Sequence, residues 1–226
     1  KINLAKSFLS QVGLTSTFNV VDFLGSGGNA NVCVVEDLKS KERFAFKYLK
    51  KTREEDKERF RSEIKILKEI KAKKISGVIS IIKDCTKDFW YTMPVAQRID
   101  DYIIGKSFEN VLQVIQSLAD TLNKLHLAGI THRDIKPNNI YYHNRKIILC
   151  DFGLARFPGK VDITRSTRGV GAVFTIAPEM LRYPNSADGK KADVYSLAKT
   201  LWILLSDEKK GFDGSYDYLN EEISLR

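Results

Sequence analysis

A glycine-rich stretch at positions 25–32, GSGGNANV, contains the first residues whose types suggest a chemical role. It lies between two segments rich in valine and phenylalanine, which are typical of β-strands. Glycines in such a turn let backbone amides close over phosphate groups without obstruction from side chains. The alternative interpretation is an ordinary glycine-rich hairpin turn.

Lys47 ends the next apolar segment, and strand alternation places it on the same side as Ala45. A lysine in this position can reach a nucleotide, although lysines at strand ends usually project into water. Glu63 offers a partner because it lies one residue before Ile64 in an amphipathic helical segment. An ion pair between Lys47 and Glu63 would aim the ammonium at phosphate oxygens. The alternative for Glu63 is an ordinary exposed helix glutamate.

Three short strings follow in the second half of the chain: HRDIKPNN at 132–139, DFG at 151–153 and APE at 177–179. In this order, and with Lys47, Glu63 and the glycine stretch upstream, the chain resembles the eukaryotic-type protein kinase family. The three strings match its catalytic loop, its metal-binding motif and the end of its activation segment. The resemblance runs from about residue 18 to the helix near 193–197. Residues 93–96 and 193–202 resemble bacterial members of the family more than animal ones.

The resemblance implies a role for each charged or amide residue of these strings. Asp134 would accept or orient the proton of the attacking hydroxyl, and Lys136 would steady the transferring phosphoryl group, as in serine/threonine kinases. Asn139 and Asp151 resemble the metal ligands, whose hard oxygen donors suit Mg²⁺, with Mn²⁺ as an alternative ion. The expected catalytic set is therefore Asp134, Lys136, Lys47 and Glu63.

The same resemblance gives His132 a packing role beneath Phe152, in line with Leu67. The implied activity is ATP-dependent transfer of the γ-phosphoryl group to serine or threonine hydroxyls of protein substrates. Lys47, Asp134, Asn139 and Asp151 are expected to converge on one triphosphate between two lobes.

The nucleotide site implied by the resemblance combines the glycine-rich loop, an adenine pocket and a hinge between the lobes. The hinge would use the carbonyl of Pro94 and the N–H of Ala96, so the missing N–H of proline does no harm. Tyr141 is expected near the adenine floor, with plain core as its alternative. The predicted ATP-binding residues are Gly25, Ser26, Gly27, Gly28, Ala30, Val32, Ala45, Lys47, Met93, Pro94, Ala96 and Tyr141.

Two positions depart from the family pattern. Ala30 replaces the third glycine of the loop and adds one methyl group, which should be tolerated. Ala172 follows Gly171 where the family usually has threonine or serine, whose hydroxyl contacts the residues matching Asp134 and Lys136. Loss of that contact motivates an alternative function, a pseudokinase or nucleotide-binding regulatory module with little turnover.

Hydroxyl side chains and arginines are interleaved between the DFG and APE strings. Arg133, directly before Asp134, is typical of kinases whose activation loop is ordered by phosphorylation. We therefore expect autophosphorylation in this segment, with a loop of merely solvated hydroxyls as the alternative. The candidate acceptors are Thr164, Ser166 and Thr167.

The elements that must position these residues change in type near Pro94. Before it, strands are expected within residues 18–49, with a polar turn at 39–42, then an amphipathic helix over 54–70 and a strand pair at 78–82 and 89–93. After it, a long helix is predicted from an apolar stripe formed by Val111, Leu112, Ile115, Leu118, Ala119, Leu122 and Leu125.

The expected fold class is therefore α+β, a bilobal protein-kinase-like fold. Residues 1–96 would form an N-lobe of antiparallel sheet plus one helix, and residues 97–226 a mainly helical C-lobe. The chain ends soon after the helix near Asp193, so the C-lobe is expected to be either minimal or shortened. Residues 207–218 would be a loop or the start of a replacement helix.

Composition limits the setting in which the protein works. The chain has 226 residues, of which 43% are hydrophobic, so a sizeable core is expected. No apolar run reaches the roughly 18 residues of a membrane helix, and no signal peptide is visible. Three widely spaced cysteines fit neither a disulfide framework nor a metal cluster, and a cytoplasmic location is expected.

The net charge of +9 favours polyanionic partners in general. Its densest patch has no aromatic platform and no nucleic-acid motif beside it, so ATP and protein substrates are the expected partners and nucleic acid is not. A solvated helix end is a better explanation of this patch than a nucleic-acid site; the patch is formed by Lys68, Lys71, Lys73 and Lys74.

Overall fold

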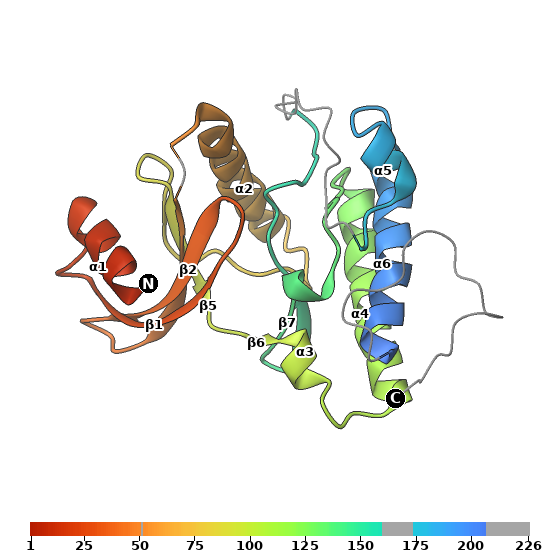
Figure 1. Cartoon of the computed structure of the whole chain (residues 1–226), viewed down its shortest axis with the longest axis horizontal. Helices are drawn as coiled ribbons and strands as arrows, with labels where there is room; N and C mark the ends of the chain where they lie inside the picture. Colours follow the sequence, from red (N-terminus) through yellow and green to blue (C-terminus); the bar gives the residue numbers. More distant parts are fainter. Residues whose placement is uncertain (51, 160–173, 207–226) are drawn as a thin grey trace. The chain divides into compact units, whose positions relative to one another are not determined.

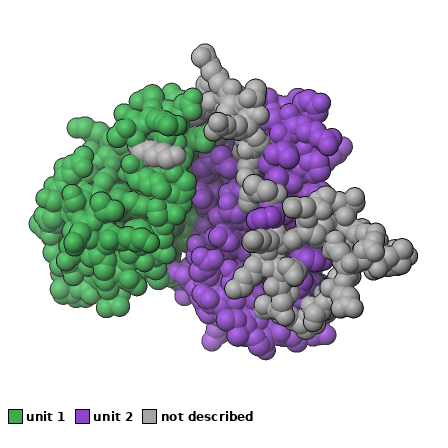
Figure 2. Space-filling view, viewed as in Figure 1, with its two compact units in different colours: residues 1–73, 79–95 green, residues 74–78, 96–226 purple. Residues whose placement is uncertain are grey.

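The computed structural model describes residues 1–50, 52–159 and 174–206. The chain divides into two compact units (Figure 2). Unit 1 consists of Lys1–Lys73 and Ile79–Val95, and unit 2 of Lys74–Val78 together with the described residues from Ala96 onward. The predicted acceptors Thr164, Ser166 and Thr167, together with Ala172 and residues 207–218, lie outside the described residues.

Unit 1 is built on an antiparallel sheet with the strand order β1-β2-β3-β5-β4. The strands are β1 (Phe18–Ser26), β2 (Ala30–Asp37), β3 (Arg43–Leu49), β4 (Asp84–Cys85) and β5 (Trp90–Pro94). The expected polar turn at 39–42 joins β2 to β3, where the Asp37 carboxylate accepts hydrogen bonds from the Lys39 and Ser40 backbone N–H groups. Lys41 takes the positive φ that such a turn requires.

The sheet of unit 1 has two different faces because side chains alternate along each strand. One face carries an aromatic cluster that includes Phe18, Phe46 and Trp90, and helix α1 (Ile2–Gln11) covers it with Ala5 and Leu9. On the other face, register partners place Val32 opposite Lys47, Lys47 opposite Tyr91 and Ala45 opposite Met93. Directly opposite residues share a face, so these side chains line one surface.

Helix α2 (Glu54–Ala72) contains the amphipathic segment expected over residues 54–70. Its apolar face buries Phe60, Ile64 and Leu67, while the acidic residues of its first turn complement the positive end of the helix dipole. Two lysines of the basic patch are engaged locally: Lys68 pairs with Asp84, and Lys71 donates to the Ile81 carbonyl.

The strand expected at residues 78–82 was wrong. Ile79 and Ile81 are buried while Ser80 and Ile82 are exposed. The backbone there forms no extended ladder in the described structure. Val78 instead makes an isolated parallel bridge with Leu149, and the strand that pairs with the free edge of β5, opposite β3, is the short β4.

Unit 2 contains a three-stranded sheet, β6 (Gln97–Arg98), β7 (Ile140–His143) and β8 (Lys146–Leu149), in that order. Its helical elements are α3 (Ile99–Tyr102), α4 (Phe108–Leu127), the 3-10 turn Pro137–Asn139, α5 (Pro178–Arg182) and α6 (Gly189–Leu205). Helices α4 and α6 pack side by side (Figure 1). None of the helices in the described part of the chain is long and apolar enough to cross a membrane.

The apolar stripe of α4 differs in part from the predicted one. Val111, Leu118, Leu122 and Leu125 are buried as expected, but Leu112 and Ala119 are exposed. Val114 and Thr121 take their places on the buried face. The helix begins at a capping box in which Ser107 and Asn110 satisfy each other's backbone N–H groups.

Candidate functional site

The ion pair expected between Lys47 and Glu63 is present in unit 1. The Lys47 ammonium lies 2.6 Å from Glu63 Oε1, joining β3 to α2. Both residues are buried, with exposed fractions of 8% and 2%. A buried charge needs a partner of opposite sign, and here each group supplies it for the other.

Tyr91, which sequence reasoning missed, contacts the same pair from β5. Its hydroxyl donates a hydrogen bond of 2.9 Å to Glu63 Oε1. The Lys47 ammonium also lies 5.7 Å from the centre of the Tyr91 ring. The signal in the sequence is a tyrosine directly opposite Lys47 in the β3–β5 register, which becomes readable only once the strands are paired.

The glycine-rich stretch forms the turn between β1 and β2. The Gly27 N–H donates to the Ala30 carbonyl at 2.9 Å, which closes the turn. Gly25, Gly27 and Gly28 do not have the positive φ that favours glycine. A methyl group added at Gly25 or Gly28 would meet nothing within 4 Å. The glycines are therefore not required for a left-handed backbone or for close packing, and their effect is to leave the backbone uncovered by side chains.

Lys50 is a second residue that the sequence did not single out, and it holds this turn from the end of β3. Its backbone N–H donates to the Asn29 carbonyl at 3.0 Å. Its ammonium donates to Ser26 Oγ at 3.0 Å and to the Gly27 carbonyl. The loop is therefore tied to the strand that carries Lys47.

The remaining predicted adenine residues are divided between the two units. In unit 1, Val32 and Ala45 lie on the face of the sheet that carries Lys47, and Met93 lies opposite Ala45. Pro94 lies opposite Phe44 at the end of β5. Ala96 and Tyr141 belong to unit 2, where Tyr141 is half-buried and pairs with Arg98 and Ile148 in the small sheet.

Three of the predicted catalytic and metal residues converge in unit 2. The Lys136 ammonium contacts both carboxylate oxygens of Asp134, at 2.8 and 3.0 Å. The Asn139 amide nitrogen donates to Asp134 Oδ2 at 2.9 Å and to the Asp134 carbonyl at 2.8 Å. The Asp134 carboxylate is 7% exposed, so it is held in a defined position at the edge of the surface.

Asp193 of α6 fixes the main chain that carries Asp134. Its carboxylate is fully buried and accepts hydrogen bonds from the backbone N–H groups of His132 and Arg133, at 2.8 and 2.7 Å. His126 of α4 lies 2.9 Å from the same carboxylate. Sequence reasoning placed Asp193 in a helix but gave it no role, because its partners lie about sixty positions away.

His132 has the expected packing position. Its ring meets the Phe152 ring edge-on, with the ring centres 4.7 Å apart, and its Nε2 lies 3.0 Å from the Cys150 carbonyl. This contact links the catalytic loop to the DFG segment within unit 2.

The residues predicted to hold a divalent cation, Asn139 and Asp151, have side-chain oxygens that suit such an ion. The Asn139 amide uses its nitrogen toward Asp134, which leaves its Oδ1 as the atom suited to a cation. The Cys150 N–H donates to the Asn139 carbonyl at 2.8 Å. Asp151, the next residue in the chain, therefore lies near Asn139. The Asp151 side chain is exposed, and its φ of 64° is a left-handed conformation uncommon outside glycine and asparagine.

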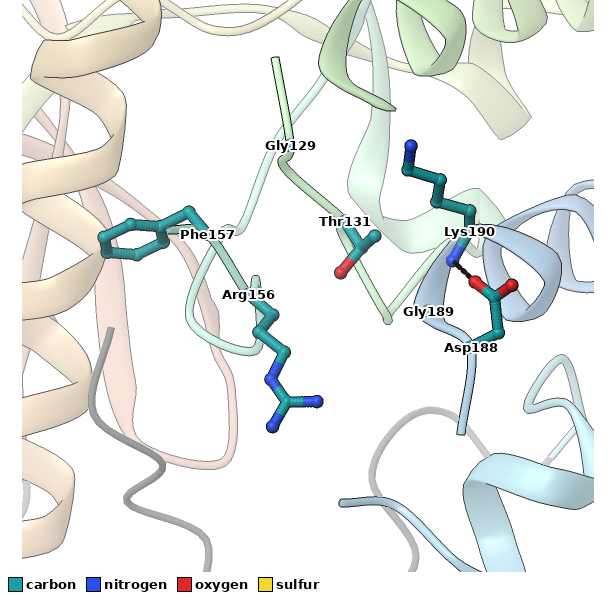
Figure 3. A pocket seen from close by; sticks show the side chains of 7 residues that line it. All are labelled: Gly129, Thr131, Arg156, Phe157, Asp188, Gly189 and Lys190. Carbon is teal, nitrogen blue, oxygen red and sulfur yellow. Dashed lines mark hydrogen bonds between the residues drawn. The ribbon is translucent and has the colours of Figure 1, made fainter. Parts of the chain in front are cut away.

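A pocket of about 540 Å³ lies elsewhere in unit 2 (Figure 3). It is lined by Gly129, Thr131, Arg156 and Phe157 and by the start of α6, where the Asp188 carboxylate accepts a hydrogen bond from the Lys190 N–H. It includes none of the predicted catalytic or nucleotide residues. Arg156 there donates to the Asn185 carbonyl, and the neighbouring Arg133 donates to that of Pro184.

Comparison with known proteins agrees with this geometry. Residues 18–221 match the family model of the protein kinase domain. The mouse serine/threonine-protein kinase H1 is 30% identical over 92% of this chain and 53% of its own length. The serine/threonine-protein kinase PrkC of Bacillus subtilis is 27% identical over 89% of this chain and 32% of its own length.

The chain spans about half the length of the mammalian relatives it matches. A crystal structure of a kinase domain superposes with a TM-score of 0.70 over 84% of this chain and 64% of its own, at 18% identity. That likeness shows the bilobal kinase fold, and the family match covers most of the sequence. The chain therefore belongs to the protein kinase domain family.

Proposed function

We propose that the chain is an ATP-dependent protein kinase that transfers the γ-phosphoryl group to serine or threonine hydroxyls. The observation that carries the proposal is the convergence of Lys136 and Asn139 on the Asp134 carboxylate. The named relatives of mouse and Bacillus subtilis are serine/threonine kinases, which supports the choice of acceptor.

In the proposed reaction the Asp134 carboxylate accepts a hydrogen bond from the attacking hydroxyl and orients it toward the phosphorus. A carboxylate suffices because phosphoryl transfer depends on positioning and charge stabilisation more than on a strong base. Lys136 stabilises charge on the transferring group. In unit 1, Lys47, paired with Glu63, presents its ammonium to phosphate oxygens of the same nucleotide.

We further propose that Asn139 and Asp151 hold Mg²⁺, or Mn²⁺ in its place. The ion would bridge phosphate oxygens and offset their charge. Adenine would lie against Val32, Ala45 and Tyr141, with main-chain contacts from the Pro94 carbonyl and the Ala96 N–H. The uncovered backbone of residues 25–28 would face the phosphates.

Two expectations about setting and modification remain proposals. A reducing compartment such as the cytoplasm is supported by the number and wide spacing of the three cysteines, which suit neither a disulfide framework nor a metal cluster. Autophosphorylation at Thr164, Ser166 or Thr167 is tested by phosphopeptide mapping of protein incubated with Mg²⁺ and ATP. Active protein with all three sites unmodified would argue against it.

The test of the proposed reaction is transfer of label from γ-labelled ATP to a generic basic protein. Asp134→Asn should lower the rate by at least about 100-fold because the carboxylate that orients the hydroxyl is lost. The matched control is Asp120→Asn on the exposed face of α4. Phosphoamino-acid analysis of the product identifies the acceptor. Equal labelling by wild type and Asp134→Asn would support the alternative, a nucleotide-binding module without turnover.

A further inference from the structure

The Lys47–Glu63 pair has a third member in unit 1. Lys47 and the Tyr91 hydroxyl both donate to the same carboxylate oxygen, Glu63 Oε1, at 2.6 and 2.9 Å. The exposed fractions of Lys47, Glu63 and Tyr91 are 8%, 2% and 1%. The three groups come from β3, α2 and β5, so one oxygen joins three elements.

Tyr91 is held where it can act on this oxygen. The antiparallel register of β3 and β5 places it directly opposite Lys47 on the same face of the sheet. Its ring also packs against Phe60, one turn before Glu63 on α2, with the ring centres 5.7 Å apart. Tyr91 therefore touches the helix at two points, through its ring and through its hydroxyl.

The hydroxyl contact limits how the pair can move. Glu63 and Lys47 have three and four rotatable side-chain bonds, whereas the tyrosine ring has two torsions and is packed on Phe60. Hydrogen bonds to an ionised group are stronger than neutral ones, and a buried carboxylate loses more when a donor is removed. The stiffest of the three side chains therefore sets the position of the carboxylate.

We propose that Tyr91 is a positioning residue that holds the Glu63 carboxylate, and through it the Lys47 ammonium, in the paired arrangement. The inference rests on the proposed function, because in protein kinases this ion pair must be in place for phosphoryl transfer. All three groups lie within unit 1.

Tyr91→Phe tests the proposal because it removes the hydroxyl and keeps the ring against Phe60. We expect kcat for phosphoryl transfer to fall about tenfold, with a smaller change in KM for ATP. We also expect amide exchange in residues 60–67 of α2 to accelerate about tenfold, and the melting temperature to fall by about 2–4 °C because one hydrogen bond to a buried carboxylate is lost. The matched control is Tyr48→Phe, a buried tyrosine of β3 in the aromatic cluster on the other face of the sheet.

A double variant separates positioning from a general loss of packing. In a Glu63→Ala background no side-chain oxygen is left to accept the Tyr91 hydroxyl, so adding Tyr91→Phe should lower kcat by much less than tenfold. Equal losses in both backgrounds would overturn the proposal, as would unchanged exchange of α2 or an unchanged kcat in Tyr91→Phe. Wild-type protein that transfers no phosphate, combined with faster α2 exchange in Tyr91→Phe, would refute the proposed function and leave the structural role of Tyr91 standing.

Discussion

At the scale of single residues, buried carboxylates organise the main chain. The fully buried Asp193 carboxylate accepts hydrogen bonds from two backbone N–H groups, those of His132 and Arg133, and lies within hydrogen-bond distance of His126. Hydrogen bonds to a charged group contribute about 1.5–3 kcal/mol each, so the loop geometry is strongly specified. The φ of 68° at Arg133 is maintained by this anchoring.

Asp37 is a carboxylate of the same kind in unit 1, and it makes stability depend on pH. The Lys83 ammonium and the backbone N–H groups of Ser40 and Lys39 lower its pKa to about 2. An unfolded aspartate has a pKa of about 4, so the unfolded chain takes up this proton first as the pH falls. The contribution of Asp37 is complete above about pH 4 and is lost toward pH 2.

We therefore predict that the melting temperature of the wild type falls more steeply between about pH 4 and pH 2 than that of Asp37→Asn. Thermal unfolding followed by circular dichroism across this range measures the difference. Asp120→Asn, on the exposed face of α4, serves as the control and should keep the wild-type slope. Parallel curves for the wild type and Asp37→Asn would show that the carboxylate contributes nothing.

At the scale of elements, helix α1 completes the core of unit 1. The family match begins at residue 18, after this helix has ended. Phe8 stacks on Tyr48 with ring centres 4.4 Å apart, and Leu9 is 2% exposed above the aromatic cluster. Without α1 the sheet face that carries Phe46 would meet water, so the helix has a packing role for the strands that position Lys47.

Leu9→Ala should reduce the free energy of unfolding by about 2–5 kcal/mol, because it removes buried methyl groups and leaves a cavity. Leu4→Ala is the matched control, since Leu4 is 62% exposed on the same helix and its loss should cost less than about 0.5 kcal/mol. Urea unfolding followed by tryptophan fluorescence compares the two. Similar costs for both variants would mean that α1 is not packed as described.

At the scale of the whole molecule, the chain passes between the units more than once. Residues 74–78 belong to unit 2 although the chain on both sides belongs to unit 1. Gly77 lies in this segment, with a φ of 84° and its carbonyl bonded to the Leu149 N–H at 2.9 Å. A Cβ at Gly77 would overlap the Thr121 side chain of α4, so only glycine fits there.

Gly77→Ala should therefore lower the free energy of unfolding by about 3 kcal/mol, from backbone strain plus steric overlap. Gly13→Ala is a matched control because Gly13 also has a positive φ, of 70°, but nothing lies within 4 Å of its added Cβ. Gly13→Ala should lower the free energy of unfolding only by the backbone strain, about 1 kcal/mol. Adding Thr121→Ala to Gly77→Ala removes Oγ1 and Cγ2, the atoms beyond Cβ that overlap, and should recover most of the steric part; no recovery would contradict this explanation.

The sequence by itself determined the family, the α+β class and the order of the main elements. The strings HRDIKPNN and DFG, Lys47 and the helical period around Glu63 are local patterns, so they can be read without coordinates. The strand expected at residues 78–82 was wrong because an apolar run rich in isoleucine also occurs where the chain buries side chains without pairing as a strand.

Only the tertiary structure showed which groups Tyr91, Lys50 and Asp193 contact: the Glu63 carboxylate, the glycine-rich turn and the main chain before Asp134. Each acts through a partner brought near by strand register or helix packing, at separations where sequence spacing carries no geometric information. The β3–β5 register sets Tyr91 beside Lys47, and the packing of α6 against α4 sets Asp193 beside His126. The type of a side chain determines which interactions a residue can make. The folded backbone determines which group it makes them with.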